Sequence, residues 1–225
     1  MRAVTGVRVK ICGTTSVADA LLAVEAGADA IGLNFYEPSP RYLSLDRAQA
    51  IAVAVAGAID RIGVFMHADP AELNRVVRAV GLDAVQVHAP VTRALAAALD
   101  CPCLPAVALH SLAQVATLDW WPALPVLLDS AGSEGAGGTG RAVDWGLAAT
   151  VARHRPVWLA GGLGPETVAR AIAEVRPEAV DAVSALERAP GVKDPERVRA
   201  FVRAARAAAA DPAVAAGIAG GAGGG

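Results

Sequence analysis

A regular alternation of short β-rich runs with longer alanine-rich runs is the feature that most constrains the fold of this chain. The alanine-rich runs place apolar residues three and four positions apart, as over 18–26 and 71–80, which is typical of amphipathic helices. Strands that alternate with helices form parallel βαβ units. Eight strands are predicted: Val7–Ile11, Ala30–Asn34, Arg61–Phe65, Ala84–His88, Cys103–Ala108, Val126–Asp129, Val157–Ala160 and Ala179–Val183.

Helix start signals support this assignment. The segment Asp69-Pro70-Ala71-Glu72 combines an N-cap aspartate, a proline at the first helical position and an acid two residues later. Ser16 with Asp19 and the pair Asp194-Pro195 form similar starts. An open doubly wound sheet shares the alternation, but eight repeats in 225 residues favour a single (β/α)8 TIM barrel of the α/β class.

The chain is predicted to form one catalytic domain with a short tail. Hydrophobic residues make up 54% of the 225 residues, enough for one large core, and barrels of this length form a single unit. The barrel is expected to cover residues 1–206. Residues 207–225 are mostly alanine and glycine, can bury little surface, and are expected to be disordered.

The charge balance and the apolar runs limit the partners and the compartment. Lys and Arg number 20 against 22 Asp and Glu, so nothing indicates nucleic acid or an anionic membrane, although a locally positive site could bind a small anion. Met1–Val9 lacks the apolar run of a signal peptide, and later apolar stretches end well short of a membrane span. A cytoplasmic protein is expected. Both a monomer and a homodimer remain open.

Neither a metal nor an organic cofactor is predicted. Histidines follow three neighbouring strands: His67, His88 and His110. The loop after the second strand supplies Asn34 and Phe35 rather than a further ligand, and Cys101-Pro-Cys103 lacks the second pair of a zinc site. The glycine-rich loop 131–143 contains a G-x-G-x-x-G spacing. It neither follows its strand directly nor opens a helix, so a lid over the substrate is favoured over a dinucleotide site.

The end of the first strand carries a candidate base. Alternation places Arg8, Lys10 and Cys12 on one face, and the apolar residues between them on the other. If the apolar set faces the helices, Lys10 and Cys12 face the barrel interior, with Cys12 at the mouth where active sites of this fold lie. A free cysteine is most often a small buried hydrophobe. Here the position favours a base or nucleophile, whose pKa Lys10 is expected to lower.

A candidate acid lies at the end of the sixth strand. Asp129 follows an apolar run and either caps the next turn or holds a proton near the substrate. Cys12 and Asp129 come from the first and sixth strands, so the two side chains can face each other across a ligand. A base and an acid on opposite walls are what a proton-shifting isomerase needs.

Other strand-end residues indicate an anionic ligand. The loops after the seventh and eighth strands are the usual phosphate site of this fold, and they contain Gly161, Gly162, Ser184 and Ala185. Arg41 follows two prolines in the loop after the second strand. It is either a solvated surface charge or the partner of a substrate carboxylate. His88 is either a satisfied core histidine or a ligand contact.

Taken together, these residues resemble those of the phosphoribosylanthranilate isomerase family. The similar segments run in the family's order from residue 9 to about residue 201, and the combination is specific although each piece is short. They are Lys10-Ile11-Cys12-Gly13, Ser39-Pro40-Arg41-Tyr42, Gly63-Val64-Phe65, Gln86-Val87-His88, Leu128-Asp129-Ser130, Gly137-Gly138-Thr139-Gly140 with Asp144-Trp145, Ala160-Gly161-Gly162-Leu163, and Pro190-Gly191-Val192-Lys193-Asp194.

The resemblance implies a cofactor-free Amadori rearrangement of N-(5'-phosphoribosyl)anthranilate in tryptophan biosynthesis. It also implies a role for each of the matching residues. It implies that Asp129 protonates the ribose ring oxygen and that Cys12 removes the proton at C2'. Arg41 would hold the anthranilate carboxylate. The phosphate would bind at Gly161, Gly162, Ser184 and Ala185, and the other residues near the substrate would be His88 and Asp181.

Two departures from the family pattern keep alternatives open. Val183-Ser184-Ala185 stands where the family commonly has Ser-Ser-Gly, and Ala89 replaces the more usual glycine after His88. A non-catalytic barrel that binds a phosphorylated ligand is one alternative, supported only by the changed phosphate loop. Another phosphosugar isomerase, for example of histidine biosynthesis, is the other. Such enzymes typically have an aspartate where this chain has Cys12.

Overall fold

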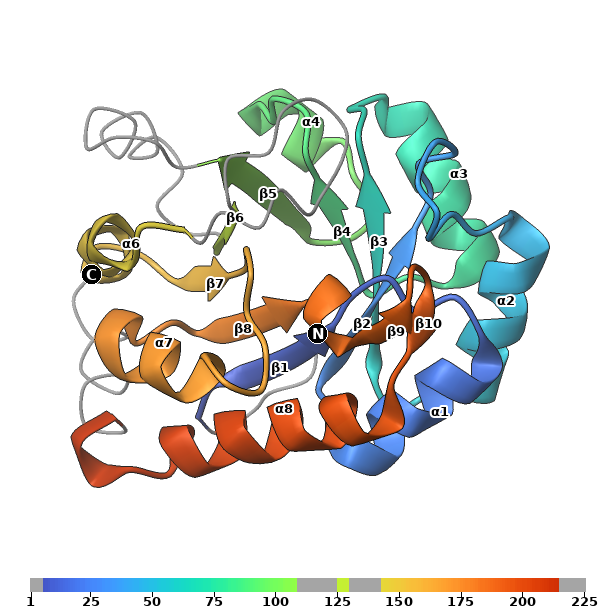
Figure 1. Ribbon diagram of the computed structural model, residues 1–225. Helices are drawn as coiled ribbons and strands as arrows, with labels where there is room; N and C mark the ends of the chain where they lie inside the picture. The colour runs from blue at the N-terminus through green and yellow to red at the C-terminus, as the bar shows by residue number, and fades with distance from the viewer. Residues whose placement is uncertain (1–5, 109–124, 130–142, 215–225) are drawn as a thin grey trace.

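The computed structural model describes residues 6–108, 125–129 and 143–214 and confirms the predicted barrel (Figure 1). Eight parallel strands pair in chain order, and the eighth closes on the first with Arg8 opposite Ala179. The strands are β1 (Arg8–Ile11), β2 (Ala30–Asn34), β3 (Asp60–Phe65), β4 (Ala84–Val87), β5 (Cys103–Ala108), β6 (Val126–Asp129), β7 (Val157–Leu159) and β8 (Ala179–Ala182). Each strand therefore begins and ends within one residue of its predicted position.

Helices surround the barrel on its outside (Figure 1). Their predicted starts are confirmed, because the side chains of Ser16, Asp69 and Asp194 each accept backbone N–H hydrogen bonds from the first turn. The described helices are α1 (Val17–Ala26), α2 (Leu45–Ala54), α3 (Pro70–Val80), α4 (Arg93–Ala97), α6 (Trp145–Ala152), α7 (Val168–Val175) and α8 (Pro195–Ala209).

Side chains of β1 alternate between two cores as predicted. Val9 and Ile11 point outward into the layer between strands and helices and are fully buried. Inside the barrel, Trp158 of β7 fills much of a smaller apolar core. The Arg8 guanidinium lies 5.6 Å from the Trp158 ring centroid and pairs with Asp60. Since active sites of this fold occupy the opposite end, this lower layer supports the barrel and leaves the mouth free for polar groups.

A short segment after β8 was not predicted. The chain forms a 3-10 turn, η1 (Ser184–Leu186), and then a two-stranded hairpin of β9 (Glu187–Ala189) and β10 (Val192–Lys193). Thr15 Oγ1 donates a 2.5 Å hydrogen bond to the Gly191 carbonyl, which ties the hairpin to the loop after β1. These strands are too short for a periodic pattern to reveal. They are held by contacts distant in sequence.

The last helix runs past the expected domain boundary at residue 206. Helix α8 continues through Ala209, and Val214 beyond it is only 5% exposed. Alanine has the highest intrinsic helix propensity, and Arg206 anchors the last turn through 2.8 Å and 2.7 Å hydrogen bonds to the Val7 carbonyl and Asp29 Oδ2. Residues 215–225, His110 and all of the predicted lid 131–143 except Val143 lie outside the described residues. Within the described part of the chain, no helix is both long and apolar enough to cross a membrane.

Candidate active site

A cavity of about 200 Å³ opens at the carboxyl ends of the strands. It collects eight of the nine site residues predicted from the sequence: Cys12, Arg41, His88, Asp129, Gly161, Gly162, Asp181 and Ser184. Ala185 does not line it. The Ala185 side chain instead lies beside Gly164, and its carbonyl accepts a hydrogen bond from Arg197 on α8. The barrel therefore brings together residues from β1, β4, β6 and β8 and from the loops that follow.

Lys10 is the centre of a buried polar network below the cavity. Its Nζ donates to Asp181 Oδ2 at 2.6 Å and to Gln86 Oε1 at 2.9 Å, so it joins β1, β8 and β4 across the interior. Gln86 Nε2 in turn lies 2.8 Å from His88 Nε2. Burial lowers the pKa of Lys10, but the charges of Asp181 and Cys12 outweigh it and raise that pKa. The network keeps Lys10 charged directly beneath the candidate base.

One carboxylate oxygen of Asp181 has no hydrogen-bond partner among the described residues. Oδ2 accepts from Lys10, whereas Oδ1 is buried and accepts no hydrogen bond from the described residues. Buried carboxylate oxygens without a partner are costly, and native structures usually satisfy them. Because Asp181 lines the cavity, Oδ1 can accept a hydrogen bond from a hydroxyl or amine of a bound ligand.

The pKa of the Cys12 thiol lies above its ordinary value, although Lys10 lowers it as expected. Burial has the largest effect and raises the pKa of the Cys12 thiol. The Lys10 charge does lower this pKa, as predicted, but Asp181 adds a negative charge that raises it. The sequence pattern could not reveal Asp181 as the third member of this group, because it lies 171 positions from Lys10.

His88 and Asp129 lie on the other side of the cavity from Cys12. Burial lowers the pKa of His88, partly opposed by the Asp129 charge, which favours a neutral imidazole paired with Gln86. Asp129 ends β6, opposite Ala108 of β5, and is partly exposed. The His88 ring and the Asp129 carboxyl are therefore close enough to interact electrostatically within the cavity.

The glycines after β7 have the backbone needed for close approach of an anion. Gly161 and Gly162 have φ values of 79° and 74°, a left-handed conformation that side chains disfavour. In the described part of the chain, Arg176 is the one non-glycine residue with positive φ. Ala185, where the family commonly has glycine, therefore adopts an ordinary backbone, and this departure causes no strain.

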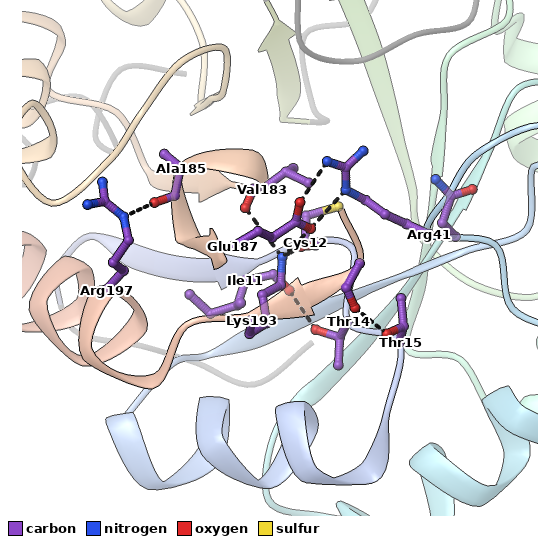
Figure 2. A network of polar contacts seen from close by, with 12 residues as sticks. Ile11, Cys12, Thr14, Thr15, Arg41, Val183, Ala185, Glu187, Lys193 and Arg197 are labelled. Atoms are coloured by element: carbon purple, nitrogen blue, oxygen red, sulfur yellow. Dashed lines mark hydrogen bonds and ion pairs between the residues drawn. The ribbon is translucent and has the colours of Figure 1, made fainter. Parts of the chain in front are cut away.

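Arg41 reaches the cavity, but it also has a protein partner that sequence reasoning missed. Its Nε and Nη2 donate to the two carboxylate oxygens of Glu187 at 2.8 Å and 2.7 Å. Lys193 Nζ lies 3.1 Å from Glu187 Oε1 and donates to the Cys12 carbonyl at 2.6 Å (Figure 2). Lys193 belongs to one of the family-like segments, a signal that could have marked it. Glu187 had no such signal.

Metal ligands do not gather in the described part of the chain. There, no group of three or more His, Cys, Asp or Glu side chains is arranged to hold an ion. His67 lies 3.7 Å from Glu72 near the surface, whereas His88 bonds to Gln86 in the interior. The two histidines therefore belong to separate environments.

Comparison with known proteins gives one consistent family. A family profile for N-(5'-phosphoribosyl)anthranilate isomerase matches residues 9–204. The N-(5'-phosphoribosyl)anthranilate isomerase of Myxococcus xanthus is 43% identical over 205 residues, which cover 89% of this chain and 96% of that protein. The profile match includes all the candidate site residues.

Solved structures agree with the sequence comparison. The phosphoribosyl anthranilate isomerase of Thermotoga maritima superposes with a TM-score of 0.84 at 38% identity, covering 89% of this chain and 99% of that one. A second structure, solved with reduced 1-(o-carboxyphenylamino)-1-deoxyribulose 5-phosphate, has a TM-score of 0.80 at 36% identity, covering 89% and 99%. With a profile match over most of its length and relatives well above 30% identity, this chain belongs to the N-(5'-phosphoribosyl)anthranilate isomerase family.

Proposed function

We propose that this chain isomerises N-(5'-phosphoribosyl)anthranilate to 1-(2-carboxyphenylamino)-1-deoxy-D-ribulose 5-phosphate, an Amadori rearrangement in tryptophan biosynthesis. The observation that carries the proposal is the placement of Cys12 and Asp129 in the same barrel-mouth cavity of a chain that belongs to this family. The reaction moves protons within one molecule. A base and an acid on facing walls are therefore sufficient groups for the chemistry.

Asp129 is proposed as the general acid. It donates its proton to the ribose ring oxygen, the bond from that oxygen to C1' breaks, and the anthranilate nitrogen forms a Schiff base with C1'. Cys12 is proposed as the base, and its thiolate takes the proton from C2' to leave an enolamine. The enolamine loses its hydroxyl proton and gains one at C1', which gives the ketone. One proton leaves Asp129 and one reaches Cys12, so the substrate keeps its composition, and proton exchange with water returns both groups to their starting forms.

The remaining cavity residues are proposed to bind the substrate. Gly161 and Gly162 are proposed to offer backbone N–H groups to the phosphate, together with Ser184 from the loop after the neighbouring strand β8. Ala185 is proposed to contribute through the loop conformation alone, since its side chain faces Gly164. Asp181 and His88 are proposed to contact the ribose chain between the phosphate and anthranilate ends.

A reducing compartment suits this chemistry. The base must be a free thiol, and all three cysteines of the chain are unpaired. We therefore propose that the enzyme works in the cytoplasm on a small phosphoribosyl substrate, with neither nucleic acid nor membrane as partner. Sedimentation equilibrium would distinguish a monomer from a homodimer.

The direct test combines a growth assay and a fluorescence assay. The chain should restore growth without tryptophan to a host lacking this isomerase, and the purified protein should remove the fluorescence of phosphoribosylanthranilate. Binding without turnover would support the non-catalytic barrel. Turnover of the aminoaldose substrate of histidine biosynthesis alone would support the other phosphosugar isomerase.

A further inference from the structure

The pairing of Arg41 with Glu187 has a specific geometry. Glu187 takes the side-on edge of the guanidinium, formed by Nε and Nη2. A guanidinium has five N–H donors, so the end-on edge keeps the two N–H groups of Nη1 and the second one of Nη2. Among the described residues, none accepts a hydrogen bond from Nη1. The end-on edge can therefore hold a second carboxylate in a two-point contact while Glu187 stays in place.

Arg41 is fixed along its stem as well as at its head. Gly13 has φ +68°, and a Cβ there would lie 2.6 Å from Arg41 Cδ and 3.1 Å from Val183 Cγ1, so the arginine stem occupies the space that a side chain would need. The Arg41 side chain is 14% exposed. An arginine held this way loses little further rotamer freedom when it binds a ligand.

Lys193 forms one charged unit with Arg41 and Glu187, and the charges of the three groups explain its part in it. An Arg41–Glu187 pair alone is neutral and would attract an anionic substrate weakly. Lys193 adds a buried ammonium 3.1 Å from Glu187 Oε1, so the three groups together carry one positive charge. Lys193 also donates to the Cys12 carbonyl at 2.6 Å (Figure 2), which connects this unit to the backbone of the proposed base.

We propose that Glu187 and Lys193 are positioning residues that hold Arg41 ready for the substrate carboxylate. Glu187 orients the guanidinium so that its end-on edge faces the cavity. Lys193 keeps the unit positive and ties it to Cys12. The proposal rests on the proposed function, because it takes the carboxylate of the anthranilate ring as the ligand of Arg41.

Glu187→Gln distinguishes positioning from simple electrostatics, because the two explanations predict opposite changes in the affinity for the substrate carboxylate. If charge alone mattered, removing a negative group beside an anion site would strengthen binding of the carboxylate. If Glu187 positions Arg41, the amide keeps one acceptor oxygen and turns an NH2 donor toward the guanidinium, so the two-point contact is lost and binding weakens. Glu174→Gln is the matched control, since Glu174 pairs with Arg170 in an exposed i,i+4 ion pair on α7.

The probes are two inhibitors measured by calorimetric titration. One is reduced 1-(2-carboxyphenylamino)-1-deoxyribulose 5-phosphate, and the other is the same compound without the ring carboxyl group. Glu187→Gln should weaken binding of the first about 10-fold, a size typical of residues in one network, and change the second less than about threefold. Glu174→Gln should change neither. Equal weakening for both compounds would make Glu187 a general structural residue, and tighter binding of the first would make it a competitor of the substrate. Either result overturns the proposal.

A double-mutant cycle tests whether Glu187 acts through Arg41. Arg41→Ala should weaken binding of the carboxylate probe by about 10- to 150-fold, as expected for the loss of hydrogen bonds to a charged group. Adding Glu187→Gln to Arg41→Ala should then have no further effect on that probe. Independent effects of the two changes would contradict positioning.

The role of Lys193 is tested by two measurements, the affinity for the carboxylate probe and the turnover rate. Lys193→Met should weaken the carboxylate probe and lower turnover, because Cys12 loses its backbone contact, and Lys193→Arg should restore part of both. Unchanged turnover in a folded Lys193→Met protein would exclude the link to Cys12.

If the unaltered chain binds the carboxylate probe but does not isomerise phosphoribosylanthranilate, the proposed function fails and the binding test still stands. If it is active and Glu187→Gln changes nothing, only the positioning role fails.

Discussion

Lys10 Nζ lies 2.6 Å from Asp181 Oδ2 inside the barrel, and neither side chain is more than 3% exposed. Removing one partner of such a buried pair leaves an uncompensated charge in a low-dielectric interior. Replacing both partners with neutral residues avoids that cost. The pair therefore affects stability as well as the electrostatics of Cys12.

Lys10→Met should destabilise the protein by about 3–5 kcal/mol, because Asp181 would be left as a buried carboxyl group without its partner. The double variant Lys10→Met with Asp181→Asn should be less destabilised than the single one. Urea unfolding followed by circular dichroism measures both. A double variant that is the less stable of the two would show that the pair contributes net stability through more than mutual charge compensation.

The rate should rise with pH through the titration of Cys12. The thiolate is the form that accepts the C2' proton, and burial raises the pKa of this thiol, so the ascending limb of kcat/KM should lie above the ordinary range of a cysteine. Because the Lys10 charge lowers that pKa, Lys10→Met should move the limb to still higher pH. A kcat/KM profile that is flat from neutral to alkaline pH would contradict this assignment.

Cys12→Ala and Asp129→Asn should each lower kcat by about 100-fold or more with smaller effects on substrate affinity, as expected for groups that transfer protons. Cys103→Ala is the matched control. Cys103 is a buried thiol in β5, and its pKa of about 12 keeps it protonated. Steady-state kinetics with phosphoribosylanthranilate separates the two parameters. An active Cys12→Ala enzyme would require another base.

Substitutions in the loops after β7 and β8, which are proposed to bind the phosphate, should affect phosphate binding to different extents. Gly162→Ala forces a side chain into the left-handed region at φ 74°, at a cost of about 1–2 kcal/mol, and should weaken competitive inhibition by inorganic phosphate. Val183→Ser combined with Ala185→Gly should change the Michaelis constant less than about 10-fold, since Ala185 has no positive φ to relieve. A large gain in phosphate affinity from the double change would show that the departures at these positions weaken the site.

Local sequence patterns determined most of the architecture. Strand and helix positions follow from side-chain periodicity and from capping residues, which act over a few positions along the chain. The same alternation placed Lys10 and Cys12 inside the barrel and the apolar residues of β1 against the helices. Once the barrel was predicted, strand ends located Cys12, Asp129 and Arg41, and the family resemblance implied their roles.

Tertiary structure alone decided how these residues are paired. Asp181 is 171 positions from Lys10, and Glu187 is 146 positions from Arg41, so no local pattern could report either contact. The sign of the Cys12 pKa shift followed from burial, which depends on the closed barrel. The same holds at the C-terminus, where a segment expected to bury too little surface for an ordered structure is helical through Ala209, with Arg206 bound to Val7 and Asp29. Helical propensity is a local property, but the contacts that hold this last turn are made only when the first and last elements of the barrel meet.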